Sequence, residues 1–269
     1  MRCAPLLSSR FSSFAAAPAL PSLDDMEHYE AIIQIALLVV TGAAVHLSLS
    51  PPNPSVKSEE CCLGTQGTQT LFERVVQSVT YCSKSMVWLG VAFNVVATVI
   101  KSFRLHTTRQ EALAWVEIIY PGSVATGSKI HLLMVAGALF AVCGAALRIW
   151  CFKSLGPLFT FEITIHPQHR LVVHGPYAWV RHPSYTGVFF TLTGASLVLA
   201  APGTWSADSG IWTPLGAISL FIWVSKCLFA FRGMAVRYAV EDEVLRATFG
   251  TEWEDYAARV PYKFIPRVL

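Results

Sequence analysis

The sequence predicts an all-α integral membrane protein with about five transmembrane helices, whose site is formed by a cytosolic loop and a C-terminal helical tail. Two observations lead to this fold class. Hydrophobic residues make up 54% of the 269-residue chain and charged residues only 14%, whereas charged residues make up about a quarter of a soluble domain. Apolar runs of near-spanning length, about 20 residues, recur five times. The chain is therefore interpreted as a protein of the lipid bilayer.

The five predicted spans are separated by polar or proline-rich segments. They cover Tyr29 to Leu49, Ser85 to Ile100 with an extension back to about Val75, Ile130 to Phe152, Ser184 to Ala201, and Ile211 to Phe231. Loop 50–70 contains three prolines and two glycines, which break the chain between the first two spans. Segment 111–121 is apolar but too short to span, so we expect it to lie at the membrane interface or to pack on the other helices.

Basic residues predict the orientation of the C-terminal half. Loop 201–210 has no Lys or Arg, whereas basic residues precede it (Lys153, Arg170, Arg181) and follow it (Arg232, Arg237). Because cytosolic segments are enriched in Lys and Arg, residues 153–183 and the C-terminus are predicted to face the cytosol. We expect residues 1–26 to form a disordered leader, 27–136 the N-terminal transmembrane helices and loops, and 137–269 the core that carries the site.

Composition argues against several kinds of ligand. The net charge of +3 is too small to indicate a nucleic-acid partner. The seven cysteines show no CxxC spacing and no His/Cys ligand pattern, so neither a disulfide framework nor a metal site is predicted.

The stretch HGPYAWVRHPSYTG, residues 174–187, is cationic and aromatic at the edge of an apolar run. Pro183 suits the first position of a helix, because its missing N–H is not needed there. The fourth span is therefore predicted to begin at His182 and Pro183, which places Arg181 at the membrane interface. A guanidinium there can bind a carboxylate through two hydrogen bonds. The alternative is an arginine that only reaches lipid headgroups.

The tail after the fifth span carries an apolar stripe at helical spacing, formed by Leu245, Phe249, Trp253, Tyr256 and Val260. Gly250 is expected to close one helix. Thr251 and Glu254 are expected to form a capping box for the next helix.

Burial of that stripe requires the tail to fold back on the membrane body. Glu241 and Asp242 would then approach the Arg181 segment, although a charged run of this kind is also typical of a solvated helix start. Arg259 precedes Pro261 and supplies a second guanidinium. We expect Arg181 and Arg259 to face one cavity together with the two carboxylates.

Together, HGPYAWVRHPSYTG and EDEVLRATFGTEWEDYAARVPYKFIP resemble the isoprenylcysteine carboxyl methyltransferase family. The pattern of that family is RHPxYxG followed by EExxLxxxFGxxYxxYxxRVP, and the resemblance covers roughly residues 137–269. Two positions depart from the pattern. Asp242 stands where the family prefers a second Glu, and Trp253 stands where it has Tyr.

The resemblance implies S-adenosylmethionine-dependent methylation of the C-terminal carboxylate of a prenylated cysteine in CaaX-processed proteins, at the endoplasmic reticulum membrane. It implies catalytic roles for Arg181, Arg259 and Glu241. The residues it implies for cofactor binding are Leu171, Val172, Val173, His174, Gly175, Tyr177, His182, Tyr185, Glu241 and Asp242. No metal is implied. A carboxylate is already ionised at pH 7, so the reaction needs no general base.

Other protein classes share parts of the pattern. Phospholipid N-methyltransferases have a similar RHP element, and NADPH-dependent membrane sterol reductases resemble both this element and the VPYKFIP ending. The reductases usually carry an Arg-Asp pair where this chain has Glu241 and Asp242, which favours the methyltransferase interpretation. A third alternative is a membrane scaffold whose Arg and His residues only bind headgroups.

Overall fold

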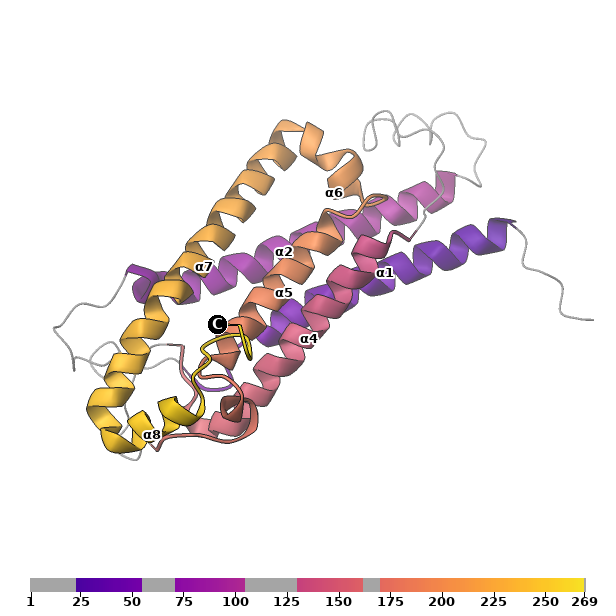
Figure 1. Cartoon of the computed structure of the whole chain (residues 1–269). Helices are drawn as coiled ribbons and strands as arrows, with labels where there is room; N and C mark the ends of the chain where they lie inside the picture. Colours follow the sequence, from indigo (N-terminus) through magenta and orange to yellow (C-terminus); the bar gives the residue numbers. More distant parts are fainter. Residues whose placement is uncertain (1–22, 55–70, 105–129, 162–169, 269) are drawn as a thin grey trace, which may run out of the picture.

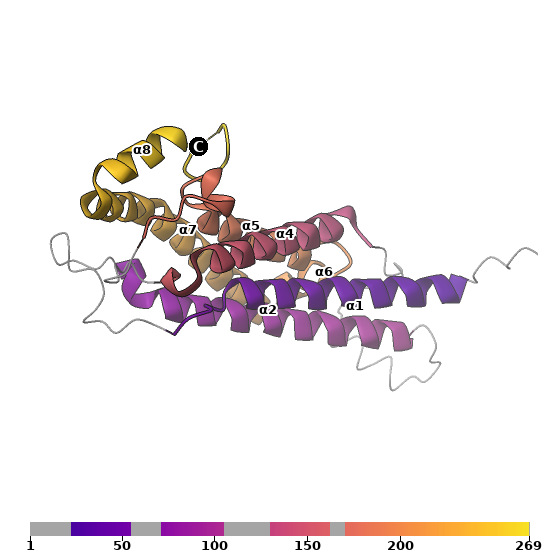
Figure 2. The same cartoon turned by 90° about the horizontal axis from the view of Figure 1, so that it is seen from below.

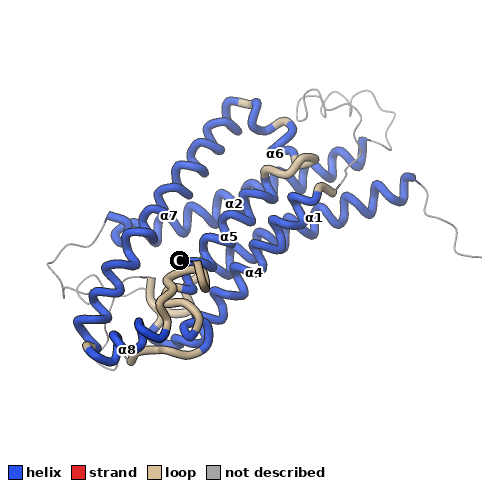
Figure 3. The backbone as a smooth tube through the Cα atoms, in the orientation of Figure 1, coloured by secondary structure: helices blue, strands red, loops and turns tan. Residues whose placement is uncertain are grey.

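The computed structural model describes residues 23–54, 71–104, 130–161 and 170–268. The described residues form helices, turns and loops, with no strand among them (Figure 3). The long helices are α1 (Leu23–Ser48), α2 (Leu71–Arg104), α4 (Leu132–Leu155), α5 (Pro183–Leu199), α7 (Pro214–Phe249) and α8 (Thr251–Arg259). Short helical turns, η1 (Gly156–Leu158), η2 (Gly175–Ala178), α6 (Trp205–Asp208) and η3 (Gly210–Trp212), connect them. The predicted leader, up to residue 22, and segment 111–121 lie outside the described residues.

Within the described residues, four helical segments are long and apolar enough to cross a bilayer, so the chain is a multi-pass membrane protein. They are Met26–Ser48, Arg74–Ser102, Leu132–Leu158 and Pro214–Phe249. The remaining predicted span is α5, a helix of 17 residues, which rises about 25 Å at about 1.5 Å per residue. The all-helical membrane class is confirmed, whereas the count of five spans stays a prediction.

Helices α4 and α5 form the most closely packed pair in the bundle (Figure 1). Small residues at their interface bring the two backbones together. A Cβ atom on Gly144 would lie 2.6 Å from the Gly187 carbonyl oxygen, and one on Gly194 would lie 2.4 Å from the Ala141 backbone nitrogen. Close approach of this kind is how helices associate where lipid supplies no hydrophobic driving force. The α4–α5 pair is therefore a rigid base for the segment between them, which carries the Arg181 motif.

Helix α7 runs without a break from the far side of the bundle to the tail (Figure 1). The sequence placed the end of the last span at Phe231, but the helix continues to Phe249. Its 36 residues rise about 54 Å, well beyond the roughly 30 Å hydrocarbon core. The last turns of α7, which lie beside α8 in Figure 2, are therefore expected to stand outside the membrane.

Gly250 separates α7 from α8. Its φ of 53° lies in the region that favours glycine, which confirms the predicted helix end. The predicted capping box of Thr251 and Glu254 is wrong. Gly250 is both the last cap of α7 and the first cap of α8, so Thr251 is already inside α8 and no side chain caps that helix. Glu254 instead bonds Arg246, with Nη2 and Oε1 2.9 Å apart.

Candidate active site

The Arg181 segment is shaped by the start of α5. Pro183 is the first residue of the helix and His182 is its N-cap residue, which confirms the predicted boundary. The preceding turn, η2, also begins beside a proline. Pro183 has no backbone N–H to donate, and none is needed at the first position of a helix, so α5 begins there and not earlier. Arg181 and His182 are consequently presented at one end of the bundle.

The C-terminal segment folds back and pairs with this motif. The backbone N–H groups of Arg181 and His182 donate to the carbonyls of Tyr262 and Lys263, at 2.9 and 2.8 Å. The Thr186 hydroxyl donates to the Phe264 carbonyl at 2.8 Å. The predicted fold-back of the tail is thus what the structure has. These hydrogen bonds from the C-terminal segment also fix the position of the Arg181 motif.

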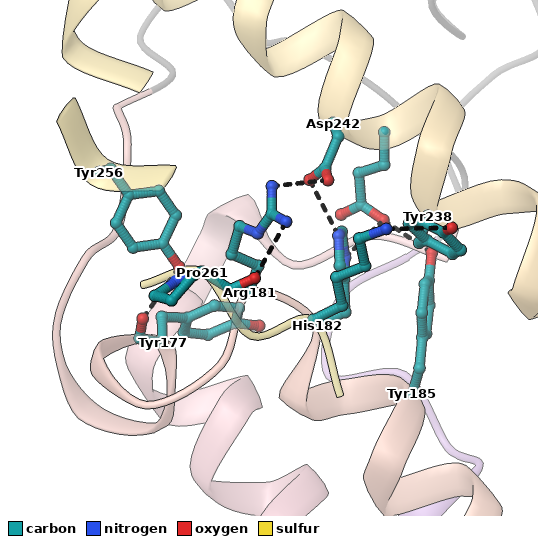
Figure 4. A network of polar contacts seen from close by, with 10 residues as sticks. Tyr177, Arg181, His182, Tyr185, Tyr238, Asp242, Tyr256 and Pro261 are labelled. Carbon is teal, nitrogen blue, oxygen red and sulfur yellow. Dashed lines mark hydrogen bonds and ion pairs between the residues drawn. The ribbon is translucent and has the colours of Figure 1, made fainter. Parts of the chain in front are cut away.

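Asp242 is held by both residues of the motif (Figure 4). Arg181 Nη1 donates to Asp242 Oδ2 at 2.9 Å, and His182 Nε2 lies 2.9 Å from Asp242 Oδ1. The Arg181 and Asp242 side chains are 11% and 14% exposed, so solvent screens this pair little. Asp242 therefore ties the end of α7 to the start of α5.

Glu241 has a different environment. Its Oε2 accepts a hydrogen bond of 2.7 Å from the Tyr185 hydroxyl, and its side chain is 34% exposed. The residue lines a cavity, whereas Asp242 does not. The carboxylate that faces open space is therefore Glu241.

The cavity has a volume of about 180 Å³ and extends from the motif into the space between α2, α5 and α7. Six of the predicted site residues line it: Leu171, Val172, Tyr177, Arg181, Tyr185 and Glu241. The others, Val173, His174, Gly175, His182, Asp242 and Arg259, do not. His182 is buried behind the wall, in contact with Asp242.

Arg259 does not face this cavity. It is exposed, and its Nε donates to the Asp255 carbonyl one turn earlier in α8, at 3.3 Å. The apolar face of α8 is fixed by Tyr256 and Val260, which are buried, so Arg259 lies on the exposed side. The expectation that Arg181 and Arg259 face one cavity is therefore corrected. The catalytic role of Arg259 stays a prediction.

Two arginines that were not predicted as site residues from the sequence are buried in the cavity wall. Arg148, on α4, is 4% exposed, and Arg237, on α7, is 6% exposed. Arg148 Nε donates to the Ser48 carbonyl at 3.0 Å, and its Nη1 donates to the Ser184 hydroxyl at 2.6 Å. An arginine inside an apolar run, such as Arg148 in LRIWCF, is itself the signal that identifies such a residue, because charges within spans are costly and mark functional sites.

The charge balance of the cavity is strongly positive. Four arginines line it, Arg148, Arg170, Arg181 and Arg237, against the single carboxylate of Glu241 among the described lining residues. Arg181 is already paired with Asp242, but its Nε is buried without a hydrogen-bond partner. A buried donor without an acceptor is costly, so the site is suited to an anionic or hydrogen-bond-accepting ligand.

Two tyrosines close the outer side of the site. The Tyr256 hydroxyl donates to the Tyr177 carbonyl at 2.9 Å. Burial raises the pKa of Tyr177 well above its ordinary value, and the charge of Glu241 adds to this. Burial also raises the pKa of Tyr256. Both phenols are therefore neutral at physiological pH.

The chain is similar to known proteins over part of its length. Residues 136–223 match the model of the isoprenylcysteine carboxyl methyltransferase (ICMT) family. The chain is 30% identical over 126 residues to a probable protein-S-isoprenylcysteine O-methyltransferase of Oryza sativa subsp. indica, an alignment that covers 46% of this chain and 56% of the relative. It is 31% identical over 135 residues to the Homo sapiens protein-S-isoprenylcysteine O-methyltransferase, covering 49% of this chain and 41% of the relative.

A third relative, the Tribolium castaneum protein-S-isoprenylcysteine O-methyltransferase, is 28% identical over 166 residues, which are 59% of this chain and 53% of the relative. The chain thus spans about half the length of the curated relatives it matches. The matched family segment contains Arg148, the Arg181 motif and α5, and it ends within α7 before Arg237 and Glu241. Residues 136–223 are therefore similar to the isoprenylcysteine carboxyl methyltransferase family.

Proposed function

We propose that the protein transfers a methyl group from S-adenosylmethionine to the C-terminal carboxylate of a prenylated cysteine in CaaX-processed proteins. The observation that carries this proposal is a single cavity with two different ends. One end is lined by Arg148, Arg237 and Glu241, and the other is apolar and lies between transmembrane helices. The carboxylate of a prenylated cysteine likewise combines a charged group with an apolar chain.

In this proposal Arg148 and Arg237 hold the acceptor carboxylate. A planar guanidinium can bind both oxygens of a carboxylate, and two buried positive charges in one wall are relieved by an anion. Arg148 is held in place by Ser48 and Ser184, so its orientation is set before the substrate arrives. Such positioning contributes to catalysis without any proton transfer.

The acceptor needs no general base, because a carboxylate of ordinary pKa is ionised at pH 7. Its oxygen forms a bond to the methyl carbon as the bond from that carbon to sulfur breaks, and the two opposite charges are neutralised. Exclusion of water from the apolar part of the cavity favours a step in which charge disappears. The role of the protein is therefore to position both partners and to exclude solvent.

The residues of the cavity fit S-adenosylmethionine. When bound, this cofactor supplies an electrophilic methyl group on a positively charged sulfur. Glu241 offers a carboxylate to ribose hydroxyls or to the cofactor ammonium group, and the unpartnered Nε of Arg181 offers a donor to its carboxylate. Leu171 and Val172 can supply backbone groups, and Tyr177 and Tyr185 complete the wall. Asp242, which bonds both Arg181 and His182, does not line the cavity and holds the Arg181 side chain in position.

The proposed location is the endoplasmic reticulum membrane, with the cavity mouth facing the cytosol. The basic residues Arg170 and Arg181 line the cavity at the end of the bundle that carries the site, whereas loop 201–210, at the opposite end in Figure 1, has no Lys or Arg. This distribution supports a cytosolic site under the positive-inside rule. A cytosolic mouth gives access to a water-soluble cofactor, and the span interior gives access to the prenyl chain.

The proposal is tested by measuring ligand binding and acceptor choice with the purified full-length protein in lipid nanodiscs. We expect S-adenosylmethionine to bind and NADPH not to bind, in isothermal titration calorimetry. We also expect label from the cofactor to enter farnesylcysteine but not phosphatidylethanolamine. Binding of NADPH alone would favour a reductase, and labelling of the phospholipid alone would favour a lipid N-methyltransferase; either result contradicts the proposal.

A further inference from the structure

Arg148, one of the two arginines proposed to hold the acceptor, is enclosed by three aromatic rings. Its Cζ atom lies 5.0 Å from the centroid of the Phe152 ring, 5.4 Å from that of Phe159 and 5.5 Å from that of Phe161. The rings also pack on one another. The centroids of Phe152 and Phe159 are 4.5 Å apart, and those of Phe159 and Phe161 are 6.0 Å apart. We call these three phenylalanines the aromatic collar.

The aromatic collar leaves part of the guanidinium for a ligand. Aromatic rings attract a cation by their faces, whereas the N–H groups of a guanidinium donate in its plane. Arg148 Nε donates to the Ser48 carbonyl, and Nη1 donates to the Ser184 hydroxyl. Among the described residues Nη2 has no hydrogen-bond partner, and Arg148 lines the cavity. Nη2 is therefore a donor available to an acceptor carboxylate.

The loop that carries part of the collar is held by Asn53, from the segment that follows α1. Asn53 Nδ2 donates to the Gly156 carbonyl at 2.8 Å and to the Phe159 carbonyl at 2.9 Å. Gly156 is the first residue of η1 and Phe159 is its C-cap residue. One amide nitrogen, with its two N–H groups, thus joins both ends of this turn. Asn53 therefore fixes the loop at the point where the buried Phe159 side chain enters the collar.

The same segment also contacts Arg148 directly. Ser48 is the last residue of α1, and the last carbonyl groups of a helix have no partner within it. Its carbonyl accepts the hydrogen bond from Arg148 Nε at 3.0 Å. Residues 48–53 thus reach the guanidinium both directly and through the collar, although they lie outside the residues that match the family model.

We propose that Asn53 is a positioning residue for methyl transfer, which keeps the aromatic collar on Arg148 so that Nη2 faces the carboxylate of the prenylated cysteine. This inference rests on the proposed function. The collar excludes water from the guanidinium, and a hydrogen bond is stronger where water is excluded. If the loop moved, water would reach Arg148 and its orientation would no longer be fixed. The acceptor would then bind more weakly, whereas the cofactor contact proposed for Glu241 would remain.

The first test replaces Asn53 by Asp, which has nearly the same shape but no N–H to donate when ionised. We expect the KM for farnesylcysteine to rise about tenfold and kcat to change less than about threefold, because binding of the acceptor is weakened. The Kd for S-adenosylmethionine should stay within about twofold of the native value, since the cofactor contacts are elsewhere. Asn53→Ala, which also removes both donors, should give the same pattern.

Ser50→Ala is the matched control for this test. The Ser50 hydroxyl belongs to the same segment and bonds His46 and Lys84, but not η1. An unchanged KM in both Asn53 variants would overturn the inference. So would an equal rise of KM in Ser50→Ala, or a loss of affinity shared equally by the cofactor and the acceptor.

The second test asks whether Asn53 acts through Arg148. Arg148→Lys keeps the charge but removes the flat guanidinium. Adding Asn53→Asp to this variant should raise the KM for farnesylcysteine by less than about twofold, because the contact through which Asn53 acts is already lost. Adding Asn53→Asp to Glu241→Gln should give the full rise of about tenfold, since distant sites add independently. A full rise in the Arg148→Lys background would contradict the proposal.

A third test does not depend on turnover. Binding of farnesylcysteine to the full-length protein is measured by calorimetry with S-adenosylhomocysteine present, so that no methyl group can be transferred. Phe161→Leu, which removes one ring of the collar, should weaken binding about fivefold or more, as should Asn53→Asp. Phe140→Leu is the control, because Phe140 is an exposed residue of α4. Native affinity in both collar variants, or an equal loss in Phe140→Leu, would overturn the inference.

Failure of the proposed function looks different from failure of this inference. If the proposed function is wrong, the native protein methylates no prenylcysteine, and the role of Asn53 falls with it. If only this inference is wrong, the native protein methylates farnesylcysteine and the Asn53 variants bind it with native affinity.

Discussion

The Nη1 atom of Arg181 lies 2.9 Å from the Oδ2 atom of Asp242, in a pair that joins the beginning of α5 to the end of α7. These residues are 61 positions apart in the chain. The pair holds the guanidinium against the wall of a cavity whose arginines outnumber its carboxylates. The expected effects of substitutions follow from this arrangement.

Asp242→Asn should destabilise the protein and lower its activity together. The change removes a charge partner from a mostly buried arginine, which is expected to cost about 2 kcal/mol. Thermal unfolding in detergent and the rate of methyl transfer measure the two effects. Glu243→Gln is the control, because Glu243 is the next residue of α7 and is exposed. If both substitutions lowered stability and activity equally, the Arg181–Asp242 pair would not contribute more than an exposed charge.

Glu241→Gln should weaken binding of S-adenosylmethionine about tenfold or more, because a charge-assisted hydrogen bond to the ligand is lost. Calorimetry measures the Kd directly. Asp242→Asn is the comparison, since Asp242 faces Arg181 and His182 rather than the cavity. If Asp242→Asn weakened cofactor binding more than Glu241→Gln, Asp242 would be the cofactor carboxylate.

Arg237→Lys should lower kcat/KM for the prenylated acceptor about a hundredfold and leave the Kd for the cofactor nearly unchanged. Lysine keeps the charge, but it cannot bind both oxygens of a carboxylate. Arg232→Lys serves as the control, since Arg232 is exposed on the same helix. A loss confined to cofactor binding would instead move Arg237 to the cofactor side of the cavity.

Arg259→Ala separates two expectations. The family resemblance implies that this change abolishes transfer and leaves cofactor affinity intact. The exposed position of Arg259, bonded only locally to Asp255 among its hydrogen bonds in the described structure, predicts that transfer falls by less than about threefold. Single-turnover rates with saturating cofactor decide between them. Complete loss of transfer would mean that the tail closes further over the cavity when substrates bind.

Stability should fall in alkaline solution through Tyr177 and Tyr256. Their folded-state pKa values are raised by burial, whereas unfolded tyrosines ionise near pH 10. The unfolded state therefore loses its protons first, and the stabilisation present below about pH 10 is lost as the pH rises through the folded-state values. Melting temperatures between pH 8 and 11 measure this loss. Tyr256→Phe should flatten the profile, and Tyr81→Phe, at an exposed tyrosine, should not.

The local signals in the sequence predicted local structure well. Pro183 marked the start of α5 and Gly250 marked the end of α7, because each residue has a backbone preference that few positions can accept. The stripe that includes Tyr256 and Val260 predicted the fold-back, since an apolar face must be buried. The continuous course of α7 was missed, although no proline interrupts it between Phe231 and Gly250.

The composition of the cavity was harder to predict. Arg148 and Arg237 lie 89 positions apart, and only the packing of α4, α5 and α7 places both in one wall. Arg259 was predicted to face the cavity but is exposed. Its place in a motif does not determine which way its side chain points at the end of a short helix. The difference between Glu241 and Asp242 also required the three-dimensional structure, since neighbouring residues on a helix point about 100° apart.

The most direct test of the account is transfer of a labelled methyl group to a free prenylcysteine carboxylate. The purified protein in nanodiscs is incubated with tritium-labelled S-adenosylmethionine and N-acetyl-S-farnesylcysteine, and the product is treated with base. We predict that base releases labelled methanol, that the corresponding prenylcysteine amide gives none, and that Arg237→Lys lowers the yield sharply. Label that resists base, or equal labelling of the acid and the amide, would contradict the account.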